Sequence, residues 1–134
     1  MRAAEIELDT SVVLRLLVAE PAAQFEKASE FLSQCLKRGA RVHVGDLVLA
    51  EAYFALQSFY GLSKKDSLKA LGLFVEHSGV IVDPATAAIL REPQLASAKP
   101  GFVDRLIHAT SHRKGRVFVT FEKSASKLAA THLL

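Results

Sequence analysis

The stretch AEIELDTSVVLRLLV, residues 4–18, joins a predicted strand to a predicted helix with an acid between them. Ala4–Leu8 predicts a short strand, and Ser11–Val18 predicts a short helix. Asp9 directly follows the strand. Ligands of open α/β sheets bind beyond the carboxyl ends of the strands, so we expect Asp9 at the edge of the sheet where a site forms.

The rest of the chain repeats this alternation of short apolar runs and amphipathic stretches. Further helices are predicted over residues 21–38, 46–59, 63–77, from about 84, over 102–113 and 124–130, and further strands over 41–44, 80–82, 116–119 and 131–134. Asp46 and Ser63 are expected as N-caps, and Pro21 at the first position of its helix. The alternation indicates a three-layer α/β/α fold with a mostly parallel sheet of four or five strands, in a single domain over residues 1–134.

Composition limits what kind of protein this is. The chain has 134 residues, half of them hydrophobic, which suits one globular domain. Its apolar runs fall well short of the roughly 20 residues that span a bilayer. Glu5, Glu7 and Asp9 interrupt the place where a secretory signal needs an apolar core, so we expect a cytoplasmic protein. Cys35 is the single cysteine, which excludes an intramolecular disulfide and a thiolate zinc cluster.

Four isolated carboxylates stand beside apolar stretches that should pack into the core: Asp9, Glu51, Asp104 and Glu122. A carboxylate carried into partly apolar surroundings is costly unless something pairs with it, so this placement predicts a bound cation. Ligands that are all oxygen favour Mg²⁺ or Mn²⁺. Each acid taken alone also fits a cap, a turn or a surface position. Four acids from separate segments that predict one location favour a common metal site.

The predicted elements place the acids individually. Glu51 is about one turn into its helix and shares a face with Leu47, Val48, Phe54 and Ala55, so we expect it to point inward. Asp104 lies in the first turn of its helix, where the macrodipole favours a negative charge. Glu122 follows the strand that ends near residue 119, and we expect it at the same sheet edge as Asp9.

Positive charge is concentrated in the last quarter of the chain. Residues 99–134 hold seven Lys or Arg against two acids, whereas residues 1–98 hold ten against twelve. A basic surface beside a carboxylate pocket suits a polyanion whose phosphates are held by Lys and Arg. The alternative is a solvated face. The candidate phosphate contacts are Lys99, Arg105, Arg113, Lys114, Arg116 and Lys123.

Other chemistries find little support. The chain has no phosphate-binding G-x-x-x-x-G-K-[ST], no G-x-G-x-x-G after a strand and no G-x-S-x-G nucleophile elbow. His108 and His112 are four residues apart on one predicted helix, as zinc ligands can be. The residues between them are Ala, Thr and Ser, so the glutamate of a metalloprotease is missing.

Four segments together resemble a known family. They are IELDTSVVLRLL from Ile6, VLAEAYFALQSFYGLS from Val48, FVDRLIHAT from Phe102 and VFVTFEKSASKLA from Val117. In order, spacing and predicted elements they resemble the PIN domain, and in overall layout the toxin of VapBC-type toxin–antitoxin pairs. The resemblance implies a parallel sheet flanked by helices, with an acidic pocket that binds Mg²⁺ or Mn²⁺ and hydrolyses RNA.

Carried over position by position, the resemblance assigns catalytic and metal-binding roles. Asp9, Glu51 and Asp104 match the family's first three acids. Glu122 stands where the fourth acid is usually Asp, and its extra methylene puts direct metal contact in question. Ser11 and Thr120 match small hydroxyl positions beside the first and fourth acids, which implies that they position water or phosphate.

The resemblance also implies partners. Toxins of this layout form homodimers and are held inactive by a small antitoxin, and the aromatic helix 46–60 with the one after it are the expected surfaces. Two alternatives remain open at this point. One is a non-catalytic PIN-like domain that binds RNA or acts as a scaffold, and the other is a solitary RNA-processing nuclease without an antitoxin.

Overall fold

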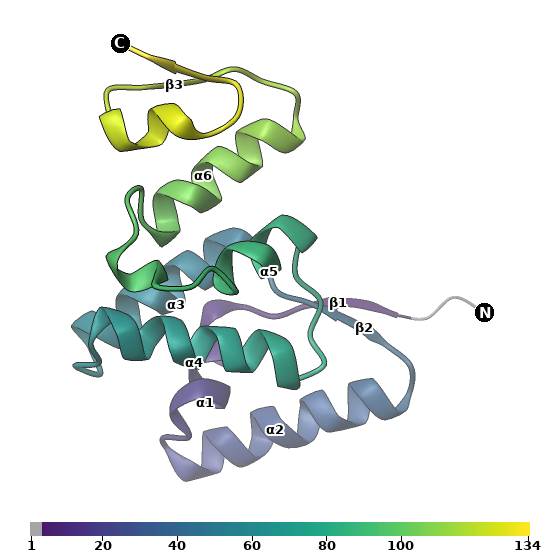
Figure 1. The fold of residues 1–134 in the computed structure, drawn as a ribbon. Coiled ribbons are helices and arrows are strands. Elements are labelled where there is room, and N and C mark those ends of the chain that lie inside the picture. The colour runs from purple at the N-terminus through teal and green to yellow at the C-terminus, as the bar shows by residue number, and fades with distance from the viewer. Residues whose placement is uncertain (1–3) are drawn as a thin grey trace. The chain divides into compact units, whose positions relative to one another are not determined.

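The computed structural model describes residues 4–134 and divides into two compact units, the first ending at Asp83 and the second running from Pro84 to Leu134. Unit 1 contains, in order, β1 (Glu5–Glu7), α1 (Thr10–Val18), α2 (Ala22–Lys37), β2 (Arg41–His43), α3 (Asp46–Ser58) and α4 (Lys64–His77). Unit 2 contains α5 (Pro84–Leu90), the 3₁₀ turn η1 (Leu95–Ser97), α6 (Phe102–Arg113), β3 (Phe118–Thr120), the 3₁₀ turn η2 (Lys123–Lys127) and β4 (Thr131–Leu133) (Figure 1).

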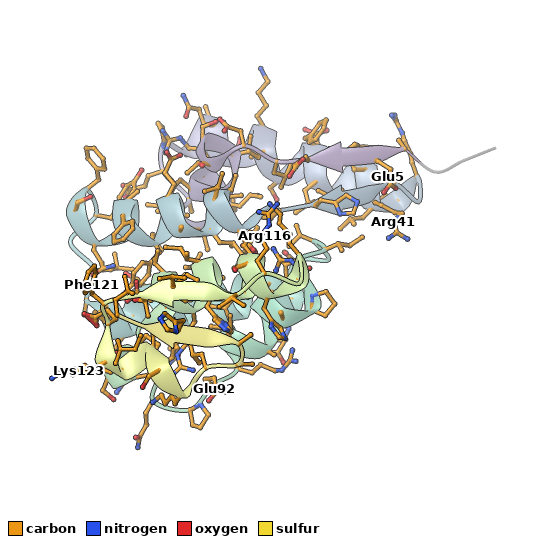
Figure 2. The ribbon with its side chains drawn as sticks, turned by 90° about the horizontal axis from the view of Figure 1, so that it is seen from above. Glu5, Arg41, Glu92, Arg116, Phe121 and Lys123 are labelled. Atoms are coloured by element: carbon orange, nitrogen blue, oxygen red, sulfur yellow. The ribbon has the colours of Figure 1, made fainter. Side chains whose placement is uncertain are left out.

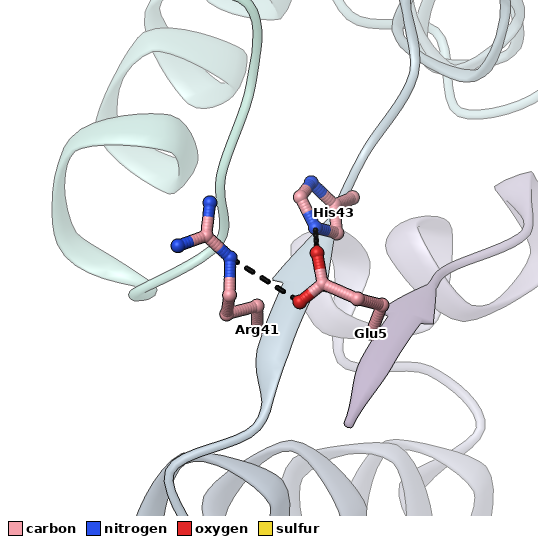
Figure 3. A network of polar contacts seen from close by, with 3 residues as sticks. All are labelled: Glu5, Arg41 and His43. Carbon is pink, nitrogen blue, oxygen red and sulfur yellow. Dashed lines mark hydrogen bonds and ion pairs between the residues drawn. The ribbon is translucent and has the colours of Figure 1, made fainter. Parts of the chain in front are cut away.

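A parallel strand pair organises unit 1. β1 pairs with β2 in a register that sets Ile6 beside Val42, and an isolated bridge from His43 to Ile81 adds a third short segment. Val42 is completely buried. Glu5 forms an ion pair with Arg41, with Nε 3.2 Å from Oε2, and accepts a hydrogen bond from His43 Nε2 at 2.9 Å (Figure 3). This network is exposed, so it contributes at most about 1 kcal/mol, and the apolar pairing beneath it matters more.

Helix packing supplies the core of unit 1. α1 packs against α2, α3 and α4, and α3 packs against α4. The fully buried side chains at these contacts are Val13 of α1, Leu49 and Leu56 of α3 and Leu71 of α4. Each stabilises the fold by roughly 1.5–3 kcal/mol relative to an exposed side chain. α1 therefore lies at the centre of this unit, directly after the strand that ends beside Asp9.

Unit 2 is built on α6. α5 packs against α6, and β3 packs against both α6 and η2. Phe102, Leu106 and Ala109 are buried along α6. β3 and β4 form a second parallel pair, in which Val119 lies opposite His132. The turn η2 occupies the connection between these two strands and leads the chain back so that they run in the same direction.

The predicted α/β class with parallel strands is confirmed. Among the described residues the strands form two parallel pairs, one in each unit, and each strand is only three residues long. Helix 102–113 has the predicted bounds, and Ser63 caps α4 as expected. No helix in the part of the chain that the structure describes combines the length and the apolarity needed to cross a bilayer.

Several predicted boundaries are wrong. Gly45, not Asp46, is the N-cap of α3, and Asp46 is its first helical residue; Pro21 likewise precedes α2 as its N-cap. Residues 124–130 form no α-helix, because the chain makes the 3₁₀ turn η2 and then enters β4. The strand predicted over 116–119 is β3, which covers Phe118–Thr120 instead. Its extent follows from where Thr131–Leu133 pairs with it, which β-propensity does not reveal.

Replacing Ser63 with Ala should lower the free energy of unfolding by about 1 kcal/mol, because the Ser63 hydroxyl accepts the backbone N–H of Asp66 at 3.0 Å at the start of α4. Urea denaturation measures this change. Ser33→Ala is the matched control: Ser33 is exposed within α2, and its loss should change stability by less than about 0.5 kcal/mol. Equal effects of the two substitutions would contradict the capping role.

Candidate functional site

The four predicted acids are divided equally between the two units. Asp9 and Glu51 belong to unit 1, and Asp104 and Glu122 belong to unit 2. All four side chains are exposed. The expectation that they lie in partly apolar surroundings is therefore wrong, and burial alone does not require a cation at any of them. Exposure has a different consequence, since it leaves their oxygens accessible to ions and water.

Asp9 occupies the junction between β1 and α1. Its backbone is extended, with φ −78° and ψ 161°, and its carbonyl accepts the N–H groups of Val12 and Val13 at the start of the helix. Asp9 is thus the N-cap by backbone, but its carboxylate makes no capping bond. Instead, Ser11 Oγ donates to Asp9 Oδ2 at 3.0 Å. The hydroxyl that follows the first acid therefore orients that acid, and the positive end of α1 favours its charge.

Glu51 does not point inward as predicted. The buried positions of α3 are Leu49, Ala52, Tyr53, Ala55 and Leu56. Glu51 lies on the other side of α3, as do Leu47 and Phe54, which are 87% and 55% exposed. Of the residues predicted to share its face, Leu47 and Phe54 are exposed like Glu51, whereas Ala55 is buried. Because α3 is apolar on nearly all sides, its sequence pattern does not reveal which side packs.

In unit 2, Asp104 lies in the first turn of α6 and Glu122 lies in the turn after β3. Thr120 Oγ1 accepts the backbone N–H of Glu122 at 3.0 Å, and Ser124 Oγ lies 3.5 Å from Glu122 Oε2. Thr120 therefore fixes the backbone that carries the fourth acid, in parallel with the way Ser11 orients the first.

The acids do not form a complete metal site within one unit. Over residues 4–134, neither unit gathers three His, Cys, Asp or Glu side chains in a group that could hold an ion. Each unit holds two of the four predicted carboxylates. The donors themselves are of the right kind, since carboxylate and hydroxyl oxygens are the ligands that Mg²⁺ and Mn²⁺ prefer.

The predicted phosphate contacts all lie in unit 2, which holds eight Lys or Arg against three acids. The exposed ones are Lys99, Arg113, Lys114, Arg116 and Lys123. Arg116 and Lys123 lie beyond opposite ends of β3 (Figure 2). Arg105 is half-buried, and its Nε donates to the Pro100 carbonyl at 2.7 Å, which holds the guanidinium in place. These residues give unit 2 a basic surface that is accessible to a polyanion.

His108 and His112 take part in packing within unit 2. Their rings stack with centroids 5.7 Å apart, and His108 is buried with its ring edge-to-face against Phe118. His108 Nε2 lies 2.7 Å from the Ala129 carbonyl, so this nitrogen carries the proton and donates. Together with Arg105 and Arg113 the two rings line a hollow of about 270 Å³ between α5 and α6. His108 thereby connects α6 to the segment before β4.

One surface had no counterpart among the sequence predictions. Between α1 and α2 lies a groove of about 430 Å³, which we call the α1–α2 groove; it is lined by Ser11, Val12, Arg15, Gln24, Lys27, Ala28 and Phe31. Its α2 members are spaced as positions 24, 27, 28 and 31, which is the spacing of one helix face. The sequence contains this spacing, but the face that it defines mixes polar and apolar residues, so a hydrophobic pattern does not reveal it.

Replacing His108 with Ala should destabilise the protein by about 1–3 kcal/mol, because the Ala129 carbonyl loses its donor and the ring contacts with Phe118 disappear. Denaturant unfolding measures the loss. His112→Ala is the comparison: His112 is exposed and loses only its stacking contact with His108, so its removal should cost less than the loss of His108. If Zn²⁺ raised the melting temperature of the wild type but of neither variant, the pair would be a metal site and the packing role would be wrong.

Comparison with known proteins places these features in a family. A family model described as PIN domain matches residues 6–130, a range that spans both units and includes all four acids. Neither the curated proteins nor the solved structures yield a match. PIN domains have a nuclease-type fold. Because the model covers nearly the whole chain, the protein belongs to the PIN domain family.

Proposed function

We propose that this protein is a divalent-metal-dependent endoribonuclease and the toxin of a toxin–antitoxin pair, working in the cytoplasm. The observation that carries the proposal is the PIN family match, which runs through every segment that holds one of the four acids. The family is one of metal-dependent nucleases, and the acids of this chain stand at the positions that the resemblance assigns to them.

In this proposal Asp9, Glu51 and Asp104 hold Mg²⁺ or Mn²⁺, and Glu122 takes part directly or through water. Their exposure supports this role, since each carboxylate is open to ions and solvent. Ser11 keeps Asp9 oriented through its 3.0 Å hydrogen bond, and Thr120 holds the Glu122 backbone. Both hydroxyl residues therefore act by positioning the acids.

The bound ion would neutralise the scissile phosphate and supply a water with a lowered pKa for in-line attack. The protein's own residues would bind and align the RNA. Exposed cations of unit 2, such as Arg116 and Lys123, would hold phosphates of the RNA backbone. Cleavage would leave a 5′-phosphate and a 3′-hydroxyl, in single-stranded or looped RNA whose backbone is accessible.

The proposal includes two protein partners, a small antitoxin and a second copy of the chain. What supports it in the structure is the apolar surface of α3 and its end, where Leu47, Phe54 and Phe59 are exposed, the last of them at 86%. Large apolar side chains that gather on one exposed helix are typical of protein interfaces. α3 is also the helix that carries Glu51, so a protein bound there would lie next to one of the acids.

Replacing Asp9 or Asp104 with Asn should reduce Mn²⁺-dependent RNA cleavage by at least about a hundredfold, because each change removes a ligand from an ion whose charge stabilisation is worth several kcal/mol. Gel analysis of a labelled single-stranded RNA measures the rate. Asp66→Asn, an exposed acid in the first turn of α4, is the control and should cleave at the wild-type rate.

Calorimetric titration with Mn²⁺ separates the enzyme from a non-catalytic PIN-like domain. Binding by the wild type that is lost in Asp104→Asn supports the nuclease. If the wild type bound no Mn²⁺ and cleaved no RNA, the protein would be an RNA-binding or scaffolding domain instead. A gene beside this one that encodes a small protein with a DNA-binding N-terminus would support the toxin role, and its absence would favour a solitary nuclease.

The double change Leu47→Ser and Phe54→Ser should convert a homodimer into a monomer in sedimentation velocity at micromolar concentration, because it removes two exposed apolar contacts from α3. Ile107→Ser, at an exposed apolar position of α6, is the control and should leave the dimer intact. A wild-type protein that sediments as a monomer would contradict the dimer.

A further inference from the structure

The α1–α2 groove brings an aromatic ring, two cations and one of the proposed metal ligands into one region of unit 1. Phe31 is 48% exposed, and Arg15 and Lys27 line the same groove. Ser11 also lines the groove and donates to the Asp9 carboxylate. The groove thus leads directly to the first acid.

The direction of the two helices decides which part of the groove lies closest to Asp9. Residues 19–21 join α1 to α2, and Arg15 near the end of α1 bonds through Nε to Gln24 near the start of α2. The helices therefore run back along one another. Ser11, one turn before Arg15, lies at the same end of the groove as Phe31, two turns after Gln24. The exposed ring is at the Asp9 end.

The polar groups of the groove are held in place. Arg15 Nη1 donates to Tyr60 Oη at 3.0 Å while Nε donates to Gln24 Oε1, so the guanidinium plane is fixed by two partners. The bond also orients the Gln24 amide, whose oxygen accepts from Arg15 and whose NH₂ group can donate to a ligand. Groups fixed before binding lose less freedom when a ligand arrives.

The charge of the groove favours an anion. Both charged residues in its lining are cations, and neither Asp nor Glu is part of it. The exposed glutamates of α2, Glu26 and Glu30, fall outside the lining. A volume of about 430 Å³ is at the lower end of the roughly 300–1,000 Å³ of small-molecule sites, and it suits one nucleotide.

We propose that the α1–α2 groove is a nucleotide-binding subsite for single-stranded RNA, in which a base stacks on Phe31 and the adjoining phosphate is held by Lys27. Arg15 adds positive charge, and the Gln24 NH₂ faces the base edge as a donor. This inference rests on the proposed nuclease function, because it takes Asp9 as the place where the RNA is cut. The subsite would select the nucleotide next to the cleaved bond.

An aromatic face beside cations is the arrangement that proteins use for single-stranded RNA, since every base has a face that can stack and every nucleotide carries a phosphate. An apolar peptide would use Phe31 equally well. It would leave Lys27 without a role and place Arg15 against an uncharged ligand, so the charge of the groove favours RNA.

The test is binding of a fluorescein-labelled, ten-nucleotide single-stranded RNA to the full chain, measured by anisotropy in EDTA so that no cleavage occurs. Phe31→Ala should weaken binding about tenfold, within the roughly 1–3 kcal/mol that stacking of one base contributes. Lys27→Ala should weaken it and reduce the slope of log K against log salt by about 0.7. Leu36→Ala and Lys37→Ala, an exposed apolar residue and an exposed lysine of α2 outside the groove, are the matched controls and should bind as the wild type does.

Two further variants separate stacking from packing. Phe31→Tyr keeps the aromatic face and should bind RNA as the wild type does, whereas Phe31→Leu keeps an apolar side chain of similar reach without that face and should lose about the same affinity as Phe31→Ala. Wild-type affinity in Phe31→Leu would overturn the subsite. So would Phe31 variants that bind RNA normally but no longer bind a partner protein, since the groove would then be a protein-docking surface.

The readout distinguishes this inference from the proposed function. If Asp9→Asn still cleaved RNA, the metal-site assignment would fail, while metal-free binding through Phe31 would still establish a nucleotide subsite in the groove. If Phe31→Ala bound RNA normally while Asp9→Asn lost cleavage, the nuclease would stand and the subsite would be wrong.

Discussion

The parallel pairing of β1 with β2 is the constraint on which unit 1 depends. The pair is only three residues long, yet the backbone N–H of Leu8 continues it by donating to the His43 carbonyl at 3.0 Å. Leu8 is buried and Asp9 is the next residue, so the ladder ends at the N-cap of α1. Because α1 packs against three other helices, the position of Asp9 is determined from both sides, by the strand before it and the helix after it.

The surroundings of the four acids differ from what a buried ionic cluster would require. Each carboxylate is exposed, and the groups that hold Asp9 and Glu122 in place are hydroxyls, at Ser11 and Thr120. Exposure leaves the oxygens of these four carboxylates accessible to a cation from solvent. The protein would then contribute to such a site by positioning the acids and not by burying them. Metal-assisted hydrolysis works in this way, because alignment of the reacting groups provides much of the rate.

The two units differ in the role that their charge suggests. Unit 2 has a clear excess of Lys and Arg, whereas the cations of the α1–α2 groove are two residues in a unit with more acids than bases. A broad basic surface attracts any nucleic acid and sets affinity, whereas a groove with one aromatic ring and fixed polar groups contacts a single nucleotide and can set preference. Affinity and selectivity would then reside on different parts of the chain.

The sequence by itself determined the family, the α/β class and most helix limits. Local signals were sufficient there: Ser63 caps α4 with its own hydroxyl, and Gly115 follows α6 with φ +67°, which glycine adopts without strain. The residues of the candidate site could also be named, because they stand in recognisable segments. Only the tertiary structure decided that Glu51 faces solvent, where β3 begins, and that Phe31 lies at the Asp9 end of a groove. Each has a physical reason. Because α3 is apolar on nearly every side, its sequence does not show which side packs, and the limits of a three-residue strand depend on its partner strand. A groove is formed by side chains of two helices, and no local sequence pattern shows how those helices approach each other.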